Sequence, residues 1–288
     1  MQISEQRMRD KLERISSIPT LPTVLEKITR LLQNPQTSAE EVGKAITTDQ
    51  ALASKVLKLV NSAFYGFPGR ISTITHAIVI LGFSTVKNVV LTASILDFFR
   101  RGSGGNPDFD MEKFWIHSAA CGAASQAVSR HLKVGDREQC FIGGLIHDIG
   151  KVVLCQYCPE EFNAILDVVR KKNVLFIDAE REVLPNVDHQ EIGAHLARHW
   201  NLPVDFQAVI RYHHAPLSAG DHCDTAAAAH VADILVRALD HGNGGDNKIP
   251  QVSERAWNDL GFAGLALGPL LDDIEDEVEK ATAMLSIE

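Results

Sequence analysis

The sequence has few cysteines, no long uninterrupted apolar stretch and no excess of basic residues. Its five cysteines are scattered over 288 residues, and so odd and sparse a set excludes a disulfide framework. The net charge of −9 disfavours non-specific binding to nucleic-acid backbones. Residues 1–14 are charged and contain no apolar signal core, and polar residues or glycine interrupt every apolar run before it reaches the roughly 18 residues of a membrane span. We therefore expect a cytoplasmic protein without membrane contact, for which nucleic acid is a disfavoured partner.

One cysteine pair, Cys155 and Cys158, has the CxxC spacing found in some metal and redox sites. A zinc site would need a second pair of ligands, and none follows at the usual spacing. The sequence therefore favours buried free thiols over a metal or redox role.

Strand patterns are also missing, because no segment alternates apolar and polar residues. Helical periodicity dominates instead, beginning with one apolar stripe over residues 21–32. Ser38, Asp49, Thr73 and Ser84 are suited to cap four helices, and Gly82 is suited to end the third of these. Further helices are predicted over residues 112–132, 138–157, 159–172, 177–184, 189–201, 204–212, 225–239 and 267–285. The expected fold class is all-α.

Two loop segments suggest the domain organisation. The glycine-rich segment 101–107 is typical of a linker, and residues 242–247 form a second loop. We expect an N-terminal helical lobe over residues 1–100, a helical core over 108–240 and a C-terminal helical extension over 248–288. No glycine-rich phosphate loop is present, and Gly143-Gly144 within a predicted helix favours close helix packing.

The middle of the chain contains an unusual set of histidines and aspartates. His147 and Asp148 are adjacent, and Lys151 lies one turn beyond His147. The other members, on separate predicted helices or at their ends, are His117, His189, His213, His214 and Asp233. Side chains from several helices can meet inside a bundle, and such nitrogen and oxygen ligands suit Fe, Mn, Zn, Co or Ni. Asp148 could bridge two metals that stabilise a phosphoryl transition state, and Lys151 could neutralise a phosphate oxygen.

A structural interpretation of these histidines is equally compatible with their spacing. A histidine on an apolar helix is more often a hydrogen-bonded core residue than a ligand, and the chain has twelve histidines. His195 and His199 lie about 100° around the helix from His189, so we assign them to solvent. The same assignment is made for His76, His131, His222 and His241.

The order and spacing of the histidines and aspartates resemble those of the HD phosphohydrolase superfamily. The phrase HDIGK at residues 147–151 is similar to the version in HD-GYP phosphodiesterases. Four N-terminal segments resemble a narrower group, the HDOD (HD-related output domain) family: IPTLPTV (18–24), ITTDQALASKVL (46–57), LVNSAFYG (59–66) and ITHAIVILG (74–82). The resemblance covers about residues 15–239.

The resemblance implies an HD-domain-like helical bundle with an additional N-terminal lobe. It implies a bacterial signal-transduction protein that acts through protein partners, since HDOD domains are regarded as regulatory or output domains without established catalysis. The likeness to HD enzymes implies metal ligation by His117, His147, Asp148, His189, His213, His214 and Asp233, with catalytic roles for Asp148 and Lys151.

Two alternatives remain open: a metal-dependent phosphohydrolase or phosphodiesterase with a dinuclear site, and a sensor that binds a phosphorylated or nucleotide ligand without hydrolysing it. Two departures from the HD-GYP pattern argue against hydrolysis of cyclic-di-GMP and against a third metal in the first alternative, the enzyme. No Gly-Tyr-Pro segment follows His213 and His214, and Lys113 stands where enzymes with a third metal have a glutamate. At most two divalent ions (Fe, Mn, Ni or Zn) are therefore expected.

Overall fold

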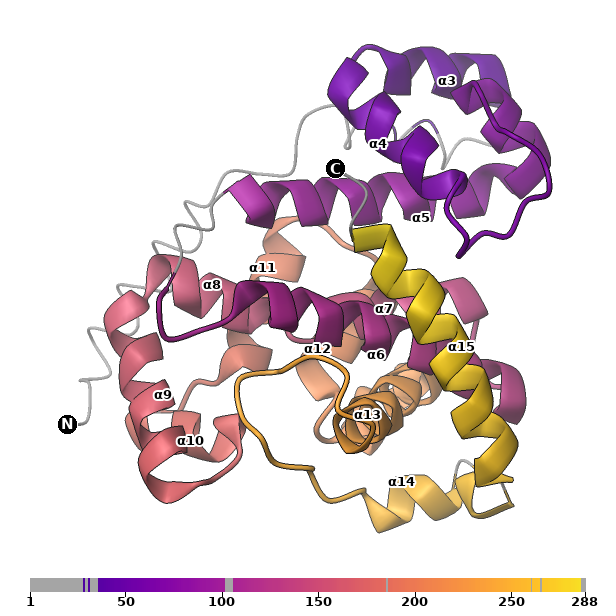
Figure 1. Ribbon diagram of the computed structural model, residues 1–288. Coiled ribbons are helices and arrows are strands. Elements are labelled where there is room, and N and C mark those ends of the chain that lie inside the picture. The colour runs from indigo at the N-terminus through magenta and orange to yellow at the C-terminus, as the bar shows by residue number, and fades with distance from the viewer. Residues whose placement is uncertain are drawn as a thin grey trace. The chain divides into compact units, whose positions relative to one another are not determined.

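The computed structural model describes residues 36–101, 106–184, 186–259, 261–264 and 266–285, together with Ile28 and Leu31. Within these residues all regular secondary structure is helical (Figure 1), which confirms the all-α prediction. The predicted stripe over residues 21–32 lies outside the described residues except at Ile28 and Leu31. The described chain divides into two compact units: α3 to α5 belong to one, and α6 to α14, with α15 as far as Val278, belong to the other.

The first unit contains α3 (Ala39–Thr47), α4 (Gln50–Val60) and α5 (Ile74–Arg101). Three of the four predicted caps, Ser38, Asp49 and Thr73, make capping hydrogen bonds. Ser38 accepts a hydrogen bond from the amide of Glu41, whose carboxylate accepts one from the Ser38 amide, so the two form a capping box. Asp49 caps α4 by accepting a hydrogen bond from the amide of Leu52.

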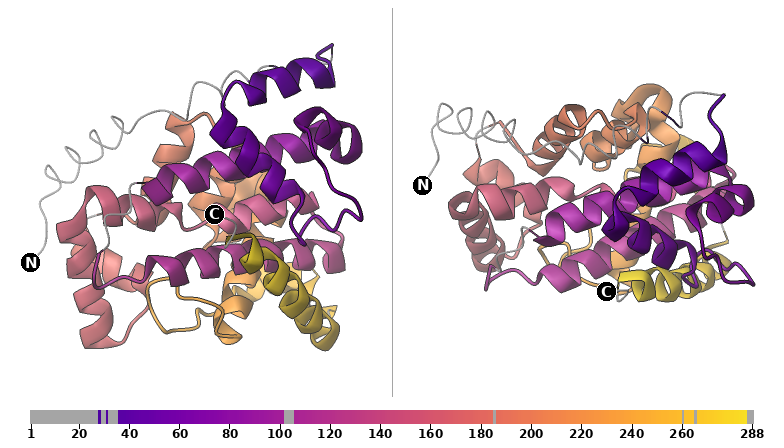
Figure 2. Two further views of the ribbon diagram at one scale, coloured as in Figure 1. Left: turned by 45° about the horizontal axis from the view of Figure 1, so that its top comes forward. Right: turned by 90° about the horizontal axis from the view of Figure 1, so that it is seen from above.

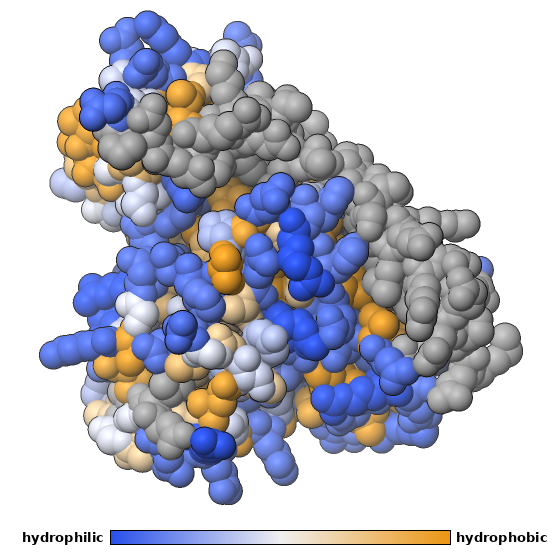
Figure 3. Space-filling model, turned by 180° about the vertical axis from the view of Figure 1, so that it is seen from behind, coloured by the Kyte–Doolittle hydropathy of each residue, from blue (hydrophilic) through white to orange (hydrophobic). Residues whose placement is uncertain are grey.

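Helix α5 is interrupted at Gly82, where φ is +85° and ψ is 165°. Gly82 thus separates two helical segments within α5, as predicted from the sequence. Contrary to the expectation from its interrupted apolar runs, the stretch Ile74–Phe98 is long and apolar enough to cross a membrane. Half of the most apolar 18-residue window in this stretch is buried inside the fold. On the face shown in Figure 3, hydrophilic residues predominate and apolar residues form only small groups.

The second unit is built around α6 (Met111–Leu132), α7 (Arg137–Ile146) and α13 (Cys223–Ala238), which pack against one another. Beside them, α11 (His189–His199) packs on α8 (Ile149–Tyr157) and α12 (Val204–Tyr212). Helices α9 (Pro159–Lys172) and α10 (Phe176–Val183) lie at one end of the unit, and α15 (Leu267–Leu285) lies at the other (Figures 1 and 2). The unit also contains three short helices that the sequence did not predict: η1 (Pro216–His222), α14 (Glu254–Asp259) and η2 (Phe262–Gly264).

The prediction of one helix over residues 138–157 is wrong, because α7 and α8 are separate and the break falls at His147 and Asp148. The apolar periodicity continues on both sides of the break, so the pattern alone did not reveal it. The break allows α7 to pack on α6 while α8 packs on α11. Gly150 makes the second contact possible, since a side chain there would collide with the carbonyl oxygen of His189.

Candidate metal centre

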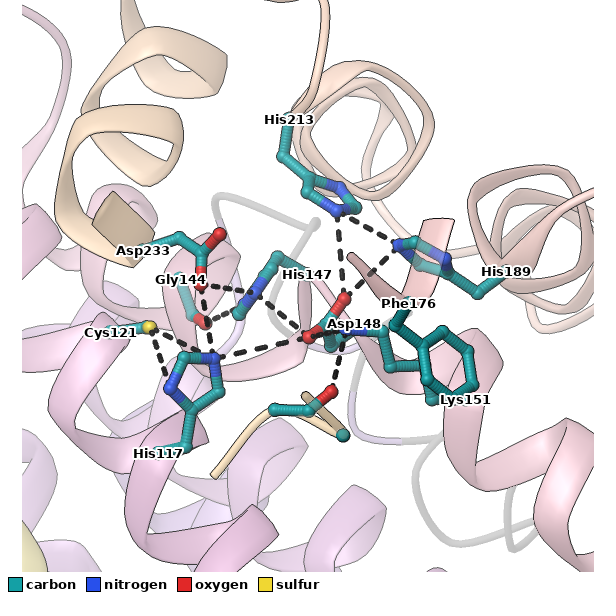
Figure 4. Close-up of polar contacts among 12 residues, drawn as sticks. His117, Cys121, Gly144, His147, Asp148, Lys151, Phe176, His189, His213 and Asp233 are labelled. Atoms are coloured by element: carbon teal, nitrogen blue, oxygen red, sulfur yellow. Dashed lines mark hydrogen bonds and ion pairs between the residues drawn. The ribbon is translucent and has the colours of Figure 1, made fainter. Parts of the chain in front are cut away.

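The predicted histidines and aspartates converge inside the second unit (Figure 4). His117 projects from α6, His147 and Asp148 stand at the break between α7 and α8, and Asp233 projects from α13. His189 is the first residue of α11, and His213 and His214 follow α12. All are buried except His214, whose exposure is intermediate. The structure therefore brings the whole predicted ligand set together.

Asp148 lies at the centre of this His/Asp cluster. Its Oδ1 is 3.2 Å from Nε2 of His189 and 3.6 Å from Nε2 of His213. Its Oδ2 is 3.3 Å from Nε2 of His147 and 4.0 Å from Nε2 of His117. One carboxylate thus faces four imidazoles, which is the arrangement expected of a bridging ligand.

Asp233 forms the second acidic point of the cluster. Its Oδ1 is 3.2 Å from Nε2 of His117 and 4.0 Å from Nε2 of His147. The same oxygen accepts a 2.7 Å hydrogen bond from Nε of Arg237, whose Nη1 donates to Asp246 at 3.1 Å. Sequence reasoning missed Arg237 and Asp246. The spacing of Asp233 and Arg237, one helical turn apart, was the available signal.

Two further residues that sequence reasoning missed contact the histidines. Glu180 is fully buried, and its carboxylate accepts hydrogen bonds from the amide of His189 at 2.9 Å and from Nδ1 of the same residue at 2.5 Å. Cys121 lies one turn after His117, with its Sγ 3.6 Å from Nε2 of that histidine. Apolar surroundings made Cys121 look like an ordinary core residue, and Glu180 falls on a helix without other candidate ligands.

Backbone and carboxylate acceptors fix the tautomers of three histidines. Nδ1 of His147 donates to the carbonyl oxygen of Gly144 at 2.7 Å. Nδ1 of His213 donates to the carbonyl oxygen of Ile210 at 3.1 Å, and Nδ1 of His189 donates to the carboxylate of Glu180. In the neutral imidazole, with its single proton on Nδ1, Nε2 carries a lone pair that points inward, as in a metal ligand held by an outer hydrogen bond.

When all the imidazoles are neutral, the interior of the cluster contains hydrogen-bond acceptors that face one another. Nε2 of His189 and Nε2 of His213 are only 3.2 Å apart, and both face Oδ1 of Asp148. Among the described residues, Nε2 of His147, Nε2 of His214 and Oδ1 of Asp148 are buried without a well-formed hydrogen bond. Buried lone pairs that face one another are costly unless a cation lies among them. The residues present thus fit a metal ion.

The electrostatic environment maintains the protonation states that metal ligation needs for most of these groups. Burial lowers the pKa of His213 to about 4, so its imidazole is neutral at pH 7. Although burial acts in the opposite direction, His147 and Lys151 hold the pKa of Asp148 well below its usual range, and Arg237 does the same for Asp233. His189 is the exception. Burial lowers its pKa, but Glu180 outweighs this and raises it to about 9.

Lys151 lies in the cluster, with its ammonium group already engaged. Nζ donates to Oδ2 of Asp148 at 2.6 Å and to the carbonyl oxygen of Gly244 at 2.9 Å. It also lies 5.0 Å from the centre of the Phe176 ring, and the side chain is buried. Whether Lys151 binds phosphate therefore depends on the segment that contains Gly244.

The other histidines lie outside the cluster, but not all are solvated as expected. Three of them pair with carboxylates: His131 with Asp273 at 2.6 Å, His222 with Asp205 at 2.7 Å, and His241 with Glu275 at 2.9 Å. His230 has a structural role. The amide of Ser253 donates to its Nε2, so its Nδ1 donates to the carbonyl oxygen of His213 and fixes the backbone of that ligand. Cys155 and Cys158 are buried, as predicted, and neither belongs to a disulfide.

Comparison with known proteins identifies several relatives of this chain. An uncharacterised protein from Treponema pallidum (strain Nichols) is 28% identical over 237 residues, which are 79% of this chain and 44% of that protein. The chain thus spans less than half the length of this relative.

Three solved structures have the same fold. An HDOD domain protein of unknown function from Geobacter sulfurreducens is 22% identical, with a TM-score of 0.76 over 97% of this chain and 98% of that one. A protein from Shewanella amazonensis SB2B, provisionally named a phosphohydrolase, is 23% identical, with a TM-score of 0.73 over 96% and 97%. A protein from Marinobacter aquaeolei VT8, provisionally named a signal transduction protein, is 20% identical, with a TM-score of 0.73 over 97% and 64%.

The model of the HDOD domain family matches residues 18–216. This range contains the four N-terminal segments quoted above and the cluster residues as far as His214. The chain therefore belongs to the HDOD domain family.

Proposed function

We propose that the protein is a cytoplasmic bacterial signal-transduction protein that binds a divalent transition metal in the His/Asp cluster and acts through protein partners. One observation carries the metal-binding part: three imidazoles whose Nδ1 atoms donate outward direct their Nε2 atoms at the ionised carboxylate of Asp148, and each offers a lone pair to a metal ion when it is neutral. Fe, Mn, Ni and Zn all accept imidazole together with carboxylate. A bound ion would polarise a phosphoryl oxygen if a phosphorylated ligand reached it.

The charge balance of the cluster favours one divalent ion per chain. Four buried carboxylates contact the network, those of Asp148, Glu180, Asp233 and Asp246. Two buried cationic side chains, Lys151 and Arg237, oppose them. Two negative charges remain, and one divalent ion balances them when the histidines are neutral. A second ion would leave an excess of positive charge, which a bound phosphate could compensate.

The first unit supports an output through protein contact. Val79, Ile80 and Phe83 on α5 are 71%, 41% and 39% exposed, and they lie close together around the kink at Gly82. This lobe belongs to the part of the chain that resembles HDOD proteins and that ordinary HD hydrolases lack. An exposed apolar group on such a lobe is suited to bind another protein. The net charge of −9 argues against nucleic acid as the partner.

A second candidate function is metal-dependent phosphoester hydrolysis. The complete ligand set favours it, with Asp148 as the bridging ligand and Lys151 one turn beyond His147. The engagement of Lys151 by Gly244 argues against free access of a substrate. A nucleotide sensor that binds without hydrolysis has the same ligand requirements and would differ only in the absence of turnover.

The decisive experiment is metal analysis of protein purified without tags or chelators. We expect about one transition metal per chain, and uptake of a second in the presence of inorganic phosphate. Asp148→Asn should abolish the uptake. Asp167→Asn, a change at an exposed residue of α9, should leave it unchanged. No uptake of Mn, Fe, Ni or Zn by the unsubstituted protein would refute the proposal.

A further inference from the structure

The segment of residues 242–248, which we call the strap, belongs to the long loop between α13 and α14 (Figure 1). It runs directly over the His/Asp cluster. The carbonyl oxygen of Gly244 accepts a hydrogen bond from Nζ of Lys151 at 2.9 Å. A Cβ atom at Gly244 would lie 3.1 Å from Nε2 of His117 and 2.8 Å from Nη2 of Arg237. The strap is therefore in contact with a candidate metal ligand.

Specific contacts hold the strap in this place. The amide of Asn243 donates to the carbonyl oxygen of Lys113 on α6 at 3.0 Å. The carboxylate of Asp246 accepts hydrogen bonds from the amide of Phe176 at 2.9 Å and from Arg237 at 3.1 Å. Within the strap, the side chain of Asn243 accepts from the Gly245 amide and donates to Asn247, both at 2.7 Å.

The outer side of the strap forms one wall of a surface cavity of about 470 Å³. Asn243, Gly245, Asp246 and Asn247 line this cavity, whereas Gly244 between them faces the cluster. The first turn of α6 lines the cavity through Lys113, and the next turn carries His117. Neighbouring residues of the strap thus face the cavity on one side and the cluster on the other.

We propose that this cavity is the entrance to the metal cluster and that the strap closes it, with the carbonyl oxygen of Gly244 occupying the place of a phosphate oxygen at Lys151. Lys113 and Arg170 at the cavity wall are ion-paired with Asp110 at 3.9 Å and Asp108 at 3.2 Å, and both carboxylates also line the cavity. The choice of an anionic ligand, such as a phosphomonoester or phosphodiester, therefore rests on the ammonium group of Lys151 inside the cluster. The choice of ligand class also rests on the proposed function, but the closure by the strap does not. Displacement of the strap would connect the cavity to the cluster and free the ammonium group of Lys151.

The test uses Gly244→Ala, whose new methyl group would push the strap away from His117 and Arg237. In metal-free protein, maleimide labelling of Cys121, resolved by mass spectrometry, reports exposure of the cluster, and Cys140 reports general unfolding. Both thiols are buried. We expect labelling of Cys121 to accelerate at least tenfold while labelling of Cys140 is unchanged. Gly268→Ala, where the added atom meets nothing within 4 Å, is the matched control and should alter neither.

A second strap variant tests whether the labelling of Cys121 reports movement of the strap rather than a general loss of protein stability. The double change Asn243→Ala and Asn247→Ala removes only the side-chain hydrogen bonds inside the strap, and Asn163→Ala removes a comparable surface pair with Asn106. The double change should also accelerate the labelling of Cys121 selectively. Unchanged labelling of Cys121 in both strap variants, or equal acceleration at Cys121 and Cys140 in both, would overturn the closure.

The ligand class is tested separately on metal-loaded protein. Inorganic phosphate should bind Gly244→Ala at least tenfold more tightly than it binds the unsubstituted protein. Unchanged phosphate binding, with selective labelling of Cys121, would overturn the assignment of an anionic ligand. If no variant takes up metal, the proposed function fails, and the labelling result still decides whether the strap closes the cluster.

Discussion

Nδ1 of His189 lies 2.5 Å from a carboxylate oxygen of Glu180, and both side chains are fully buried. Such a carboxylate orients a ligating imidazole and increases its basicity. Glu180→Gln should therefore weaken metal binding about 10- to 100-fold. The affinity can be measured by competition with a chromophoric chelator. Glu182→Gln, on the same helix at an exposed ion pair with Lys172, should have no effect, and equal affinities in the two variants would contradict the role of Glu180.

The same contact predicts how the stability of the metal-free protein depends on pH. Because Glu180 raises the pKa of His189 to about 9, the folded state holds a proton that the unfolded chain releases near pH 6.5. The resulting stabilisation is complete below pH 6.5 and is lost as the pH rises through about 9. Between pH 7.5 and pH 10, where the buried neutral histidines such as His213 no longer contribute, the free energy of unfolding should fall by an amount on the order of 2 kcal/mol, as measured by urea denaturation. A rise over this range would contradict the assignment, and Glu180→Gln should flatten the profile.

Arg237 is the only partner that the described residues show for Oδ1 of Asp233 apart from the imidazoles, and it also binds Asp246. Arg237→Met would leave two buried carboxylates without their cation, so the free energy of unfolding should fall by about 3–5 kcal/mol. Arg211→Met, at a partly exposed ion pair with Glu191, should cost about 1 kcal/mol or less. Thermal and denaturant unfolding of both variants measures the difference. Similar losses of unfolding free energy in the two variants would contradict the stabilising role of the buried ion pairs of Arg237.

Gly150 permits the contact between α8 and α11 on which the position of His189 depends. Gly150→Ala places a methyl group against the carbonyl oxygen of His189, and it should reduce the free energy of unfolding by about 2–3 kcal/mol. Metal uptake should fall as well, because the first residue of α11 must move. Gly268→Ala is again a suitable control. Because alanine has a higher helix propensity than glycine, this change should leave the free energy of unfolding unchanged or raise it by up to about 1 kcal/mol. Normal metal uptake by Gly150→Ala would contradict the argument.

Local sequence signals predicted most helices of the fold, because their information lies within a few residues. Ser38 and Asp49 cap their helices, and the predicted bounds of α9, α12 and α15 agree with the structure. The break between α7 and α8 was not predictable in this way. It depends on the packing of Gly150 against the backbone of His189, which is a contact between residues far apart in the sequence.

In the candidate site, too, residues within local motifs were predicted from the sequence, whereas residues that act through long-range contacts were not. The histidines and aspartates with a motif around them were identified, and the structure brings them together. The residues that support them were missed, since Glu180, Arg237 and Asp246 act through contacts that no local pattern encodes. The strap was recognised only as a loop, because its glycines are as common in flexible loops as in backbone that packs against other atoms.

The placement of His117 on α6 and of Asp233 on α13 also has a consequence for folding. Nε2 of His117 and Oδ1 of Asp233 are 3.2 Å apart in the folded chain, but most of the second unit lies between these residues in the sequence. Contacts of such long range are slow to form, because a large loop must close before they contribute any stability. The cluster should therefore assemble late in folding, after α13 docks on α6. A metal ion would then bind to a nearly finished fold rather than nucleate it, and metal starvation in the cell would yield folded, empty protein rather than misfolded chains.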